Sequence, residues 1–145
     1  MSLQADLKEL LHYSPKPDSP VLTAYLDVDQ SYAANLNRKF EVAFRRLLRE
    51  TESALPPGAD RAQLAEDAER MRAFLVEYTP AGRTLVMMAD ASEGLFWSHN
   101  LHVRLESMVR WAPRPFLRPL IEARSEFVRY GVILSDRSQA RLFLI

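Results

Sequence analysis

Five cations in one amphipathic segment are the residues best placed for chemistry. Over residues 35–55 the apolar side chains recur at helical spacing and form one stripe. At about 100° per residue, the cations gather on another side of the expected helix, and they are Arg38, Lys39, Arg45, Arg46 and Arg49. Clusters of arginine and lysine attract nucleic-acid phosphates and provide much of the sequence-independent affinity for them. The segment therefore predicts a phosphate-facing surface.

A solvated helix face is the simpler interpretation of the same pattern. Acidic residues of this helix and of the next one balance part of the charge, and they are Glu41, Glu50, Glu52, Glu66, Asp67 and Glu69. A second set of cations flanks a proline-rich stretch and could serve either purpose. Its members are Arg104, Arg110, Arg114 and Arg118.

Carboxylates near strand ends and one histidine pair are the candidates for metal binding or acid–base chemistry. Asp27 and Asp29 end a β-rich segment, a position from which carboxylates often hold Mg²⁺. They point to opposite sides if the strand continues, so we expect them, like Asp90, to hydrogen-bond the following loop. His99 and His102 also diverge on a strand unless the chain turns between them, and no third ligand is evident. We therefore expect no metal and no cofactor.

Aromatic and glycine residues narrow the classes of function further. We expect Trp97, Trp111, Phe96 and Phe116 to anchor the core or an interface, with base stacking as the alternative if they are exposed. The four glycines are dispersed, so there is no glycine-rich phosphate loop, and no Gly-x-Ser-x-Gly turn occurs. We expect no catalysis by these 145 residues. A small-molecule enzyme with an aspartate in a pocket is the weakest alternative.

Composition describes an ordinary globular chain. The 145 residues include 19 basic and 19 acidic side chains, so the formal net charge of zero does not itself indicate nucleic-acid or membrane binding. The absence of cysteine excludes disulfides, thiolate metal sites and a cysteine nucleophile. No signal peptide or long apolar run is evident, so we expect a cytoplasmic protein without a membrane partner.

The order of expected elements indicates an α/β (α+β) fold, with a mixed, largely antiparallel sheet packed with helices. Strands are expected at residues 21–28, as a central strand, and at 83–89, 94–98 and 101–109, as an antiparallel meander. Helices are expected at residues 2–12, 35–55, 60–77 and 116–127. Asn35 and Asp60 are placed to cap the two longer helices.

Three parts of the chain are expected. Residues 1–112 form an N-terminal α/β domain, residues 113–129 a proline-rich connector with a short helix, and residues 130–145 an opening β-hairpin of a second domain. The hairpin ends on apolar residues that would leave an exposed edge, so we expect a longer parent protein. The edge at residues 140–145 could also mediate self-association.

Four segments in order resemble the N-terminal region of bacterial archaeo-eukaryotic-type release factors, including the branch called family ten. They are the strand PVLTAYLDVD (20–29), the helix start NLNRKFE (35–41), the connector RPLI (118–121) and the hairpin RYGVILSDRSQARLF (129–143). The resemblance implies a ribosome- or tRNA-associated protein of translation termination or ribosome rescue, and a hairpin similar to the start of the family's middle domain.

The family's hydrolytic and codon-reading motifs are missing from this sequence. There is no Gly-Gly-Gln loop, no Asn-Ile-Lys-Ser loop and no Tyr-x-Cys-x-x-x-Phe strand. The resemblance therefore implies a non-catalytic domain that binds RNA, for which the five cations are the candidate contacts. A parent with a Gly-Gly-Gln-like loop would be a peptidyl-tRNA hydrolase. The alternative is a protein-interaction or assembly module without RNA binding, with an aromatic patch around Trp97 and Trp111 or the C-terminal edge as its contact.

Overall fold

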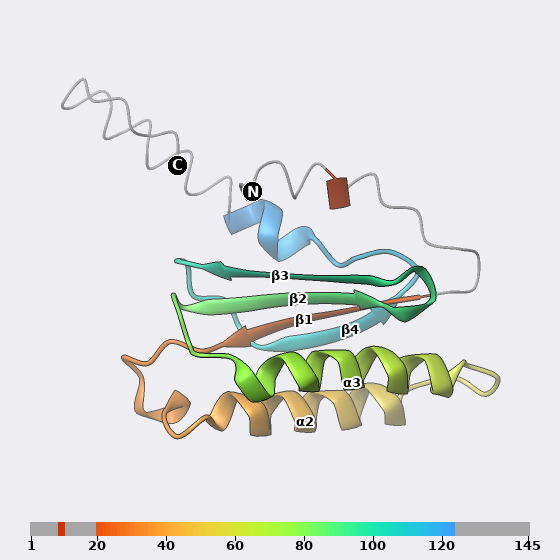
Figure 1. Cartoon of the computed structure of the whole chain (residues 1–145), viewed down its shortest axis with the longest axis horizontal. Coiled ribbons are helices and arrows are strands. Elements are labelled where there is room, and N and C mark those ends of the chain that lie inside the picture. The colour runs from red at the N-terminus through yellow and green to blue at the C-terminus, as the bar shows by residue number, and fades with distance from the viewer. Residues whose placement is uncertain (1–8, 11–19, 124–145) are drawn as a thin grey trace.

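A four-stranded antiparallel sheet carries two long helices on one of its faces (Figure 1). This computed structural model describes residues 9–10 and 20–123. The strands are β1 (Val21–Asp27), β2 (Thr84–Asp90), β3 (Leu95–Leu101) and β4 (Met108–Ala112). They lie in the order β3-β2-β1-β4. The predicted α+β fold, with helices packed on a largely antiparallel sheet, is confirmed.

The central position predicted for the first strand is also confirmed. β1 pairs with β2 on one side and with β4 on the other, and every residue from Val21 to Leu26 is buried. β2 is buried along its whole length. The nearly continuous apolar character of these two strands follows from cover on both faces of the sheet.

The predicted meander is wrong in its third strand. β2 and β3 form a hairpin, but the chain then leaves the sheet, and β4 pairs with β1 instead of β3. The segment of residues 102–107 passes the start of β2 and is bound there by Thr84. The Thr84 hydroxyl donates to the Val103 carbonyl at 2.8 Å and accepts from the Leu105 N–H at 2.9 Å. Because of this crossover, β4 begins seven residues later and ends three residues later than the expected strand of residues 101–109.

Two helices cover one face, α2 (Lys39–Ser53) and α3 (Arg61–Glu77). Asp60 caps α3 as predicted, because its Oδ1 accepts a hydrogen bond from the Gln63 N–H at 3.0 Å. Asn35 does not cap α2, since it closes the 3₁₀ turn η1 (Ala33–Asn35) four residues earlier. Its amide instead donates to Asp27 Oδ1 at 2.8 Å and to the Asp29 carbonyl at 3.0 Å.

The sheet separates two hydrophobic cores. The larger one lies under α2 and α3 and includes Phe40, Phe44 and Met71. The smaller one lies on the opposite face, where the Tyr25 hydroxyl donates to the Phe116 carbonyl at 2.5 Å. A helix described over residues 118–123 covers this second face (Figure 1).

Several predictions fall outside the described residues. They are the hairpin of residues 130–145, the second domain that it would open, and most of the helix expected at residues 2–12, of which residues 9–10 are helical. The helix expected at residues 116–127 begins at residue 118 and is described to residue 123. Within residues 9–10 and 20–123, no helix has the length and apolar character needed to cross a membrane.

Candidate functional site

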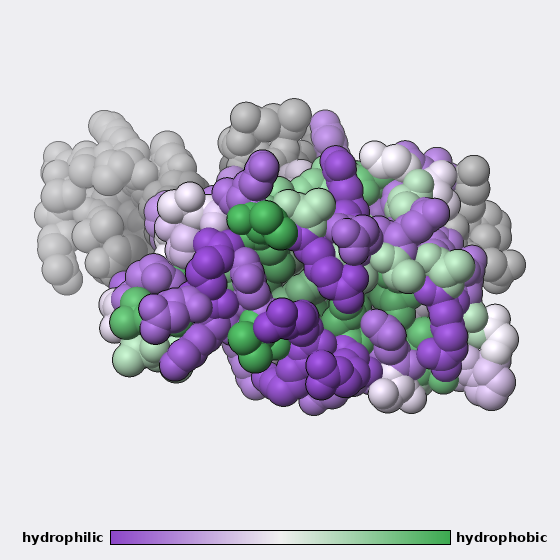
Figure 2. Space-filling model, turned by 60° about the horizontal axis from the view of Figure 1, so that its bottom comes forward, coloured by the Kyte–Doolittle hydropathy of each residue, from purple (hydrophilic) through white to green (hydrophobic). Residues whose placement is uncertain are grey.

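The outward face of α2 presents exposed cations to solvent. Lys39, Arg45, Arg46 and Arg49 are all exposed, and they lie opposite the buried Phe40, Phe44 and Leu48. Figure 2 shows the molecule turned so that its helix-covered side comes forward, where hydrophilic residues surround smaller apolar areas. Arg46 makes an exposed ion pair with Glu50 at 3.5 Å, a type of pair that neutralises charge but contributes little stability. The other three cations form no ion pair within the described part of the chain.

Arg38 does not share this open face. It precedes α2 with a left-handed backbone, and its guanidinium binds Glu41 Oε1 through Nε at 2.8 Å. The same group donates to the carbonyls of Leu75 and Tyr78, the first by Nη2 and the second by Nη1 at 2.8 Å. The last carbonyls of a helix lack intrahelical partners and carry partial negative charge, so a cation is favoured there. Arg38 thus joins the start of α2 to the end of α3.

The second set of cations serves local contacts in other parts of the fold. Arg104 Nε donates to Asp27 Oδ2 at 2.7 Å. The Arg110 guanidinium lies 4.4 Å from the ring centroid of Phe116, which belongs to the smaller core. Arg118 pairs with Glu122 at 3.0 Å, and Arg114 is exposed. These residues do not extend the cationic face of α2.

Asp27 and Asp29 organise the loop after β1, as predicted. Asp27 Oδ1 accepts from the Asp29 N–H at 3.2 Å and from Asn35. Asp29 Oδ1 accepts from the N–H and the hydroxyl of Ser31 at 2.9 and 2.7 Å, and these bonds lower the pKa of Asp29. Within residues 9–10 and 20–123, no group of three or more histidine, aspartate or glutamate side chains is arranged to hold a metal ion.

The two tryptophans lie on opposite faces and opposite edges of the sheet. Trp111 on β4 packs against the core under the helices, whereas Trp97 on β3 packs against the smaller core and stacks on His99 with ring centroids 5.9 Å apart. Their predicted role as core anchors is confirmed. The alternative of one aromatic patch around both residues is wrong. Trp97 is in register with Arg110, the residue before Trp111, and successive residues of a strand point to opposite faces.

Asp67 is buried, although the sequence interpretation counted it among the acidic residues that offset the cationic face. It is 0% exposed, on the side of α3 that packs on the sheet. Its Oδ1 accepts from the Ala91 N–H at 2.7 Å, and its Oδ2 accepts no hydrogen bond from any residue that the structure describes. Burial raises the pKa of Asp67 to about 7, and the nearby carboxylates of Asp90, Glu66 and Asp60 also raise it. A helical pattern could have located it, because position 67 lies three residues after Leu64 and four before Met71.

Asp90, at the end of β2, is also fully buried. Its Oδ1 accepts from the N–H and the hydroxyl of Ser92 at 3.2 and 2.6 Å, which confirms the predicted role in the following turn. Gln63 of α3 donates to the same oxygen and to the Pro20 carbonyl, both at 3.3 Å. This polar cluster therefore connects α3 with β2 and with the residue before β1.

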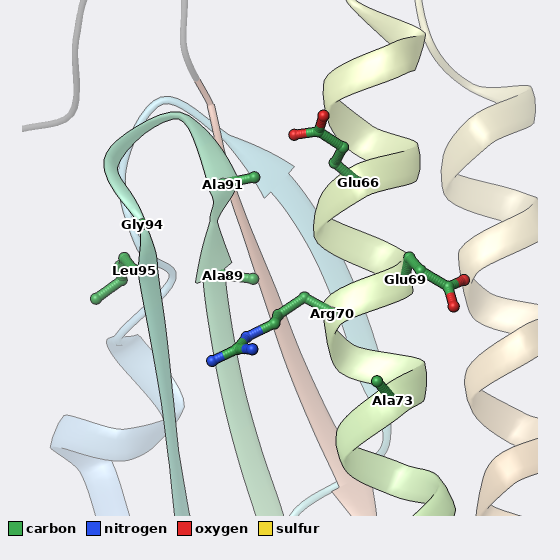
Figure 3. Close-up of a pocket in the computed structure, with 8 residues that line it drawn as sticks. All are labelled: Glu66, Glu69, Arg70, Ala73, Ala89, Ala91, Gly94 and Leu95. Atoms are coloured by element: carbon green, nitrogen blue, oxygen red, sulfur yellow. The ribbon is translucent and has the colours of Figure 1, made fainter.

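A cavity of about 550 Å³ lies between α3 and the β2–β3 hairpin (Figure 3). Its walls are mostly small or apolar, and the lining residues are Glu66, Glu69, Arg70, Ala73, Ala89, Ala91, Gly94 and Leu95. Arg70 reaches from α3 toward the hairpin, and its guanidinium lies 4.9 Å from the Phe96 ring centroid. Glu69 points away from the hairpin in Figure 3 and pairs with Arg72 at 3.3 Å. Among the residues that the structure describes, the lining provides one cation and two carboxylates but no hydroxyl or imidazole nucleophile.

Comparison of the sequence with protein-family models and with curated proteins finds no match to either.

Proposed function

We propose that the chain is a non-catalytic domain of a release-factor-like protein, which binds ribosomal or transfer RNA through the outward face of α2. The observation that carries the proposal is the exposure of four cations, Lys39, Arg45, Arg46 and Arg49, along one helix. At a rise of about 1.5 Å per residue, these positions extend over roughly 15 Å. A rigid row of this kind suits successive phosphates of a cytoplasmic RNA, and it needs no sequence readout.

The proposal uses four of the five predicted cations. Arg38 is occupied at the end of α3, so we assign it a structural role and leave RNA contact to the other four. Each phosphate neutralised changes the slope of log K against log salt by about −0.7 for single strands and about −0.9 for duplexes. Four contacts would therefore give a slope of roughly −3 to −4.

The test is a pair of double charge reversals with the same change in net charge. Arg45→Glu/Arg49→Glu alters the proposed face, and Arg114→Glu/Arg118→Glu alters exposed arginines elsewhere. Binding to purified ribosomes and to labelled tRNA would be measured from 50 to 300 mM salt. We expect the first variant to bind at least tenfold more weakly and to lose about 1.4–1.8 from the slope. The second variant should retain the slope of the natural sequence.

Equal losses of RNA affinity in both variants would mean that net charge alone explains the effect. An unchanged affinity in the first variant would exclude α2 as the contact.

A protein-interaction module is the second candidate, because Val42 on α2 and Val76 on α3 are 54% and 74% exposed. Self-association that does not respond to salt, without RNA binding, would favour this candidate.

A further inference from the structure

We propose that Asp67 is a proton-binding latch, which in its neutral form holds α3 against η2 (Ala91–Glu93) beside the cavity and which loosens this junction when the proton is lost. The carboxyl group joins two separate elements, since Asp67 lies on α3 and its Oδ1 accepts from the Ala91 N–H at 2.7 Å. Ala91 also lines the cavity (Figure 3). The junction and the cavity wall therefore share one residue.

The surroundings of Asp67 disfavour its charged form. The side chain is fully buried, and Oδ2 accepts nothing from the described residues, so an ionised carboxylate would have one oxygen without a donor there. β2 adds the carboxylate of Asp90, and α3 adds Glu66 and Asp60. Among residues 9–10 and 20–123, no cation forms an ion pair with Asp67.

The other charged groups of α3 and η2 include Arg70 and Glu93. Arg70 is the only cation among the described residues that line the cavity, but its guanidinium lies over the Phe96 ring. Glu93 belongs to η2 and carries the same sign as Asp67. The pKa of Asp67 rises to about 7 chiefly because of burial, with further contributions from Asp90, Glu66 and Asp60. The Ala91 N–H opposes this rise by favouring the carboxylate, but it satisfies only Oδ1.

The direction of the pH effect follows from linkage. The closed junction binds the proton up to about pH 7, whereas an opened junction exposes a carboxyl group with its ordinary pKa of about 4. Stability from the closed form is complete below pH 4 and is lost as the pH rises to 7. The opening constant should therefore increase about tenfold per pH unit across this interval and become constant above it.

The first measurement is hydrogen exchange of the Ala91 amide in the full chain, corrected for the intrinsic pH dependence of exchange. We expect its opening constant to rise about 50-fold between pH 5 and pH 7. In Asp67→Asn, which keeps an acceptor for Ala91 but cannot ionise, the change should be less than about threefold. An opening constant with the same pH dependence in both proteins would overturn the proposal.

The second measurement does not require the variant to fold. Carboxyl carbon NMR of the natural sequence should show Asp67 titrating near pH 7, and Asp90→Asn should lower this midpoint by removing one neighbouring negative charge. A midpoint below pH 5 would mean that Oδ2 is hydrated and the carboxylate charged, and the latch would be rejected. These outcomes do not depend on RNA binding, so they stand apart from the proposed function.

Discussion

Arg38 offers a direct test of how a side chain maintains an unfavourable backbone conformation. Its φ of 57° and ψ of 34° lie in the left-handed region, where a residue other than glycine is destabilised by about 1–2 kcal/mol. The guanidinium contacts with Glu41, Leu75 and Tyr78 offset this cost. We compare Arg38→Met, which loses the contacts and keeps the strain, with Arg38→Gly, which loses both.

The expected magnitudes follow from the contacts. A buried hydrogen bond from a charged donor contributes about 1.5–3 kcal/mol, but the Arg38 side chain is 39% exposed, so we take about 1 kcal/mol for each carbonyl contact. The partly exposed pair with Glu41 adds about 0.5 kcal/mol. Arg38→Met should therefore lose about 2.5 kcal/mol, and relief of about 1 kcal/mol of strain should limit the loss in Arg38→Gly to about 1.5 kcal/mol.

The assay is urea unfolding followed by circular dichroism, with thermal unfolding as a second measure. At roughly 3 °C per kcal/mol for a chain of this size, Tm should fall by about 7 °C for the methionine variant and by about 4 °C for the glycine variant. Lys39→Met is the control, because Lys39 is exposed and should change stability by less than about 0.5 kcal/mol. A glycine variant less stable than the methionine variant would refute the compensation between strain and contacts.

Two further substitutions test one close backbone contact and one part-buried hydrogen bond, and both are measured by urea unfolding. Gly82→Ala should cost more than about 2 kcal/mol, because a Cβ there would lie 2.7 Å from the Leu101 carbonyl oxygen at a φ of +69°. Gly58→Ala is its control, with a φ of +89° but no atom within 4 Å, and should cost at least 1 kcal/mol less, or steric contact is not the cause. Tyr25→Phe should cost about 1–2 kcal/mol by removing the donor to the Phe116 carbonyl, and an unchanged midpoint would contradict this.

Local signals in the sequence were sufficient for the elements that depend on neighbours along the chain. Asp60 is a helix cap because its side chain reaches a backbone N–H only three residues away. The continuous apolar run of residues 21–28 identified a strand covered on both faces. The burial of Asp67 could also have been predicted, since its spacing from Leu64 and Met71 places it on the buried stripe of α3.

Features that depend on distant partners could not be obtained in this way. The position of β4 is set by pairing with β1, and alternation alone does not distinguish the two edges of a sheet. The helical pattern assigned Arg38 to the outward face because it assumed helical dihedrals one residue before α2 begins. Its actual direction depends on carbonyl groups about 40 residues later, at the end of α3.

The strand order also has a consequence for how the domain forms during synthesis. Of the strands that the structure describes, β1 is made first, yet its two neighbours come much later, and Val21 pairs with Ala112. At a translation rate of about 5–20 residues per second, the roughly 90 residues between these partners take on the order of 5–20 s to be made. β2 offers β1 a first partner earlier, but the edge of β1 that pairs with β4 has no partner until then. The nascent chain thus exposes this edge of β1 for a long time. Substitutions that make the strand more prone to aggregate should reduce the yield of folded protein even where the stability of the finished domain is unchanged.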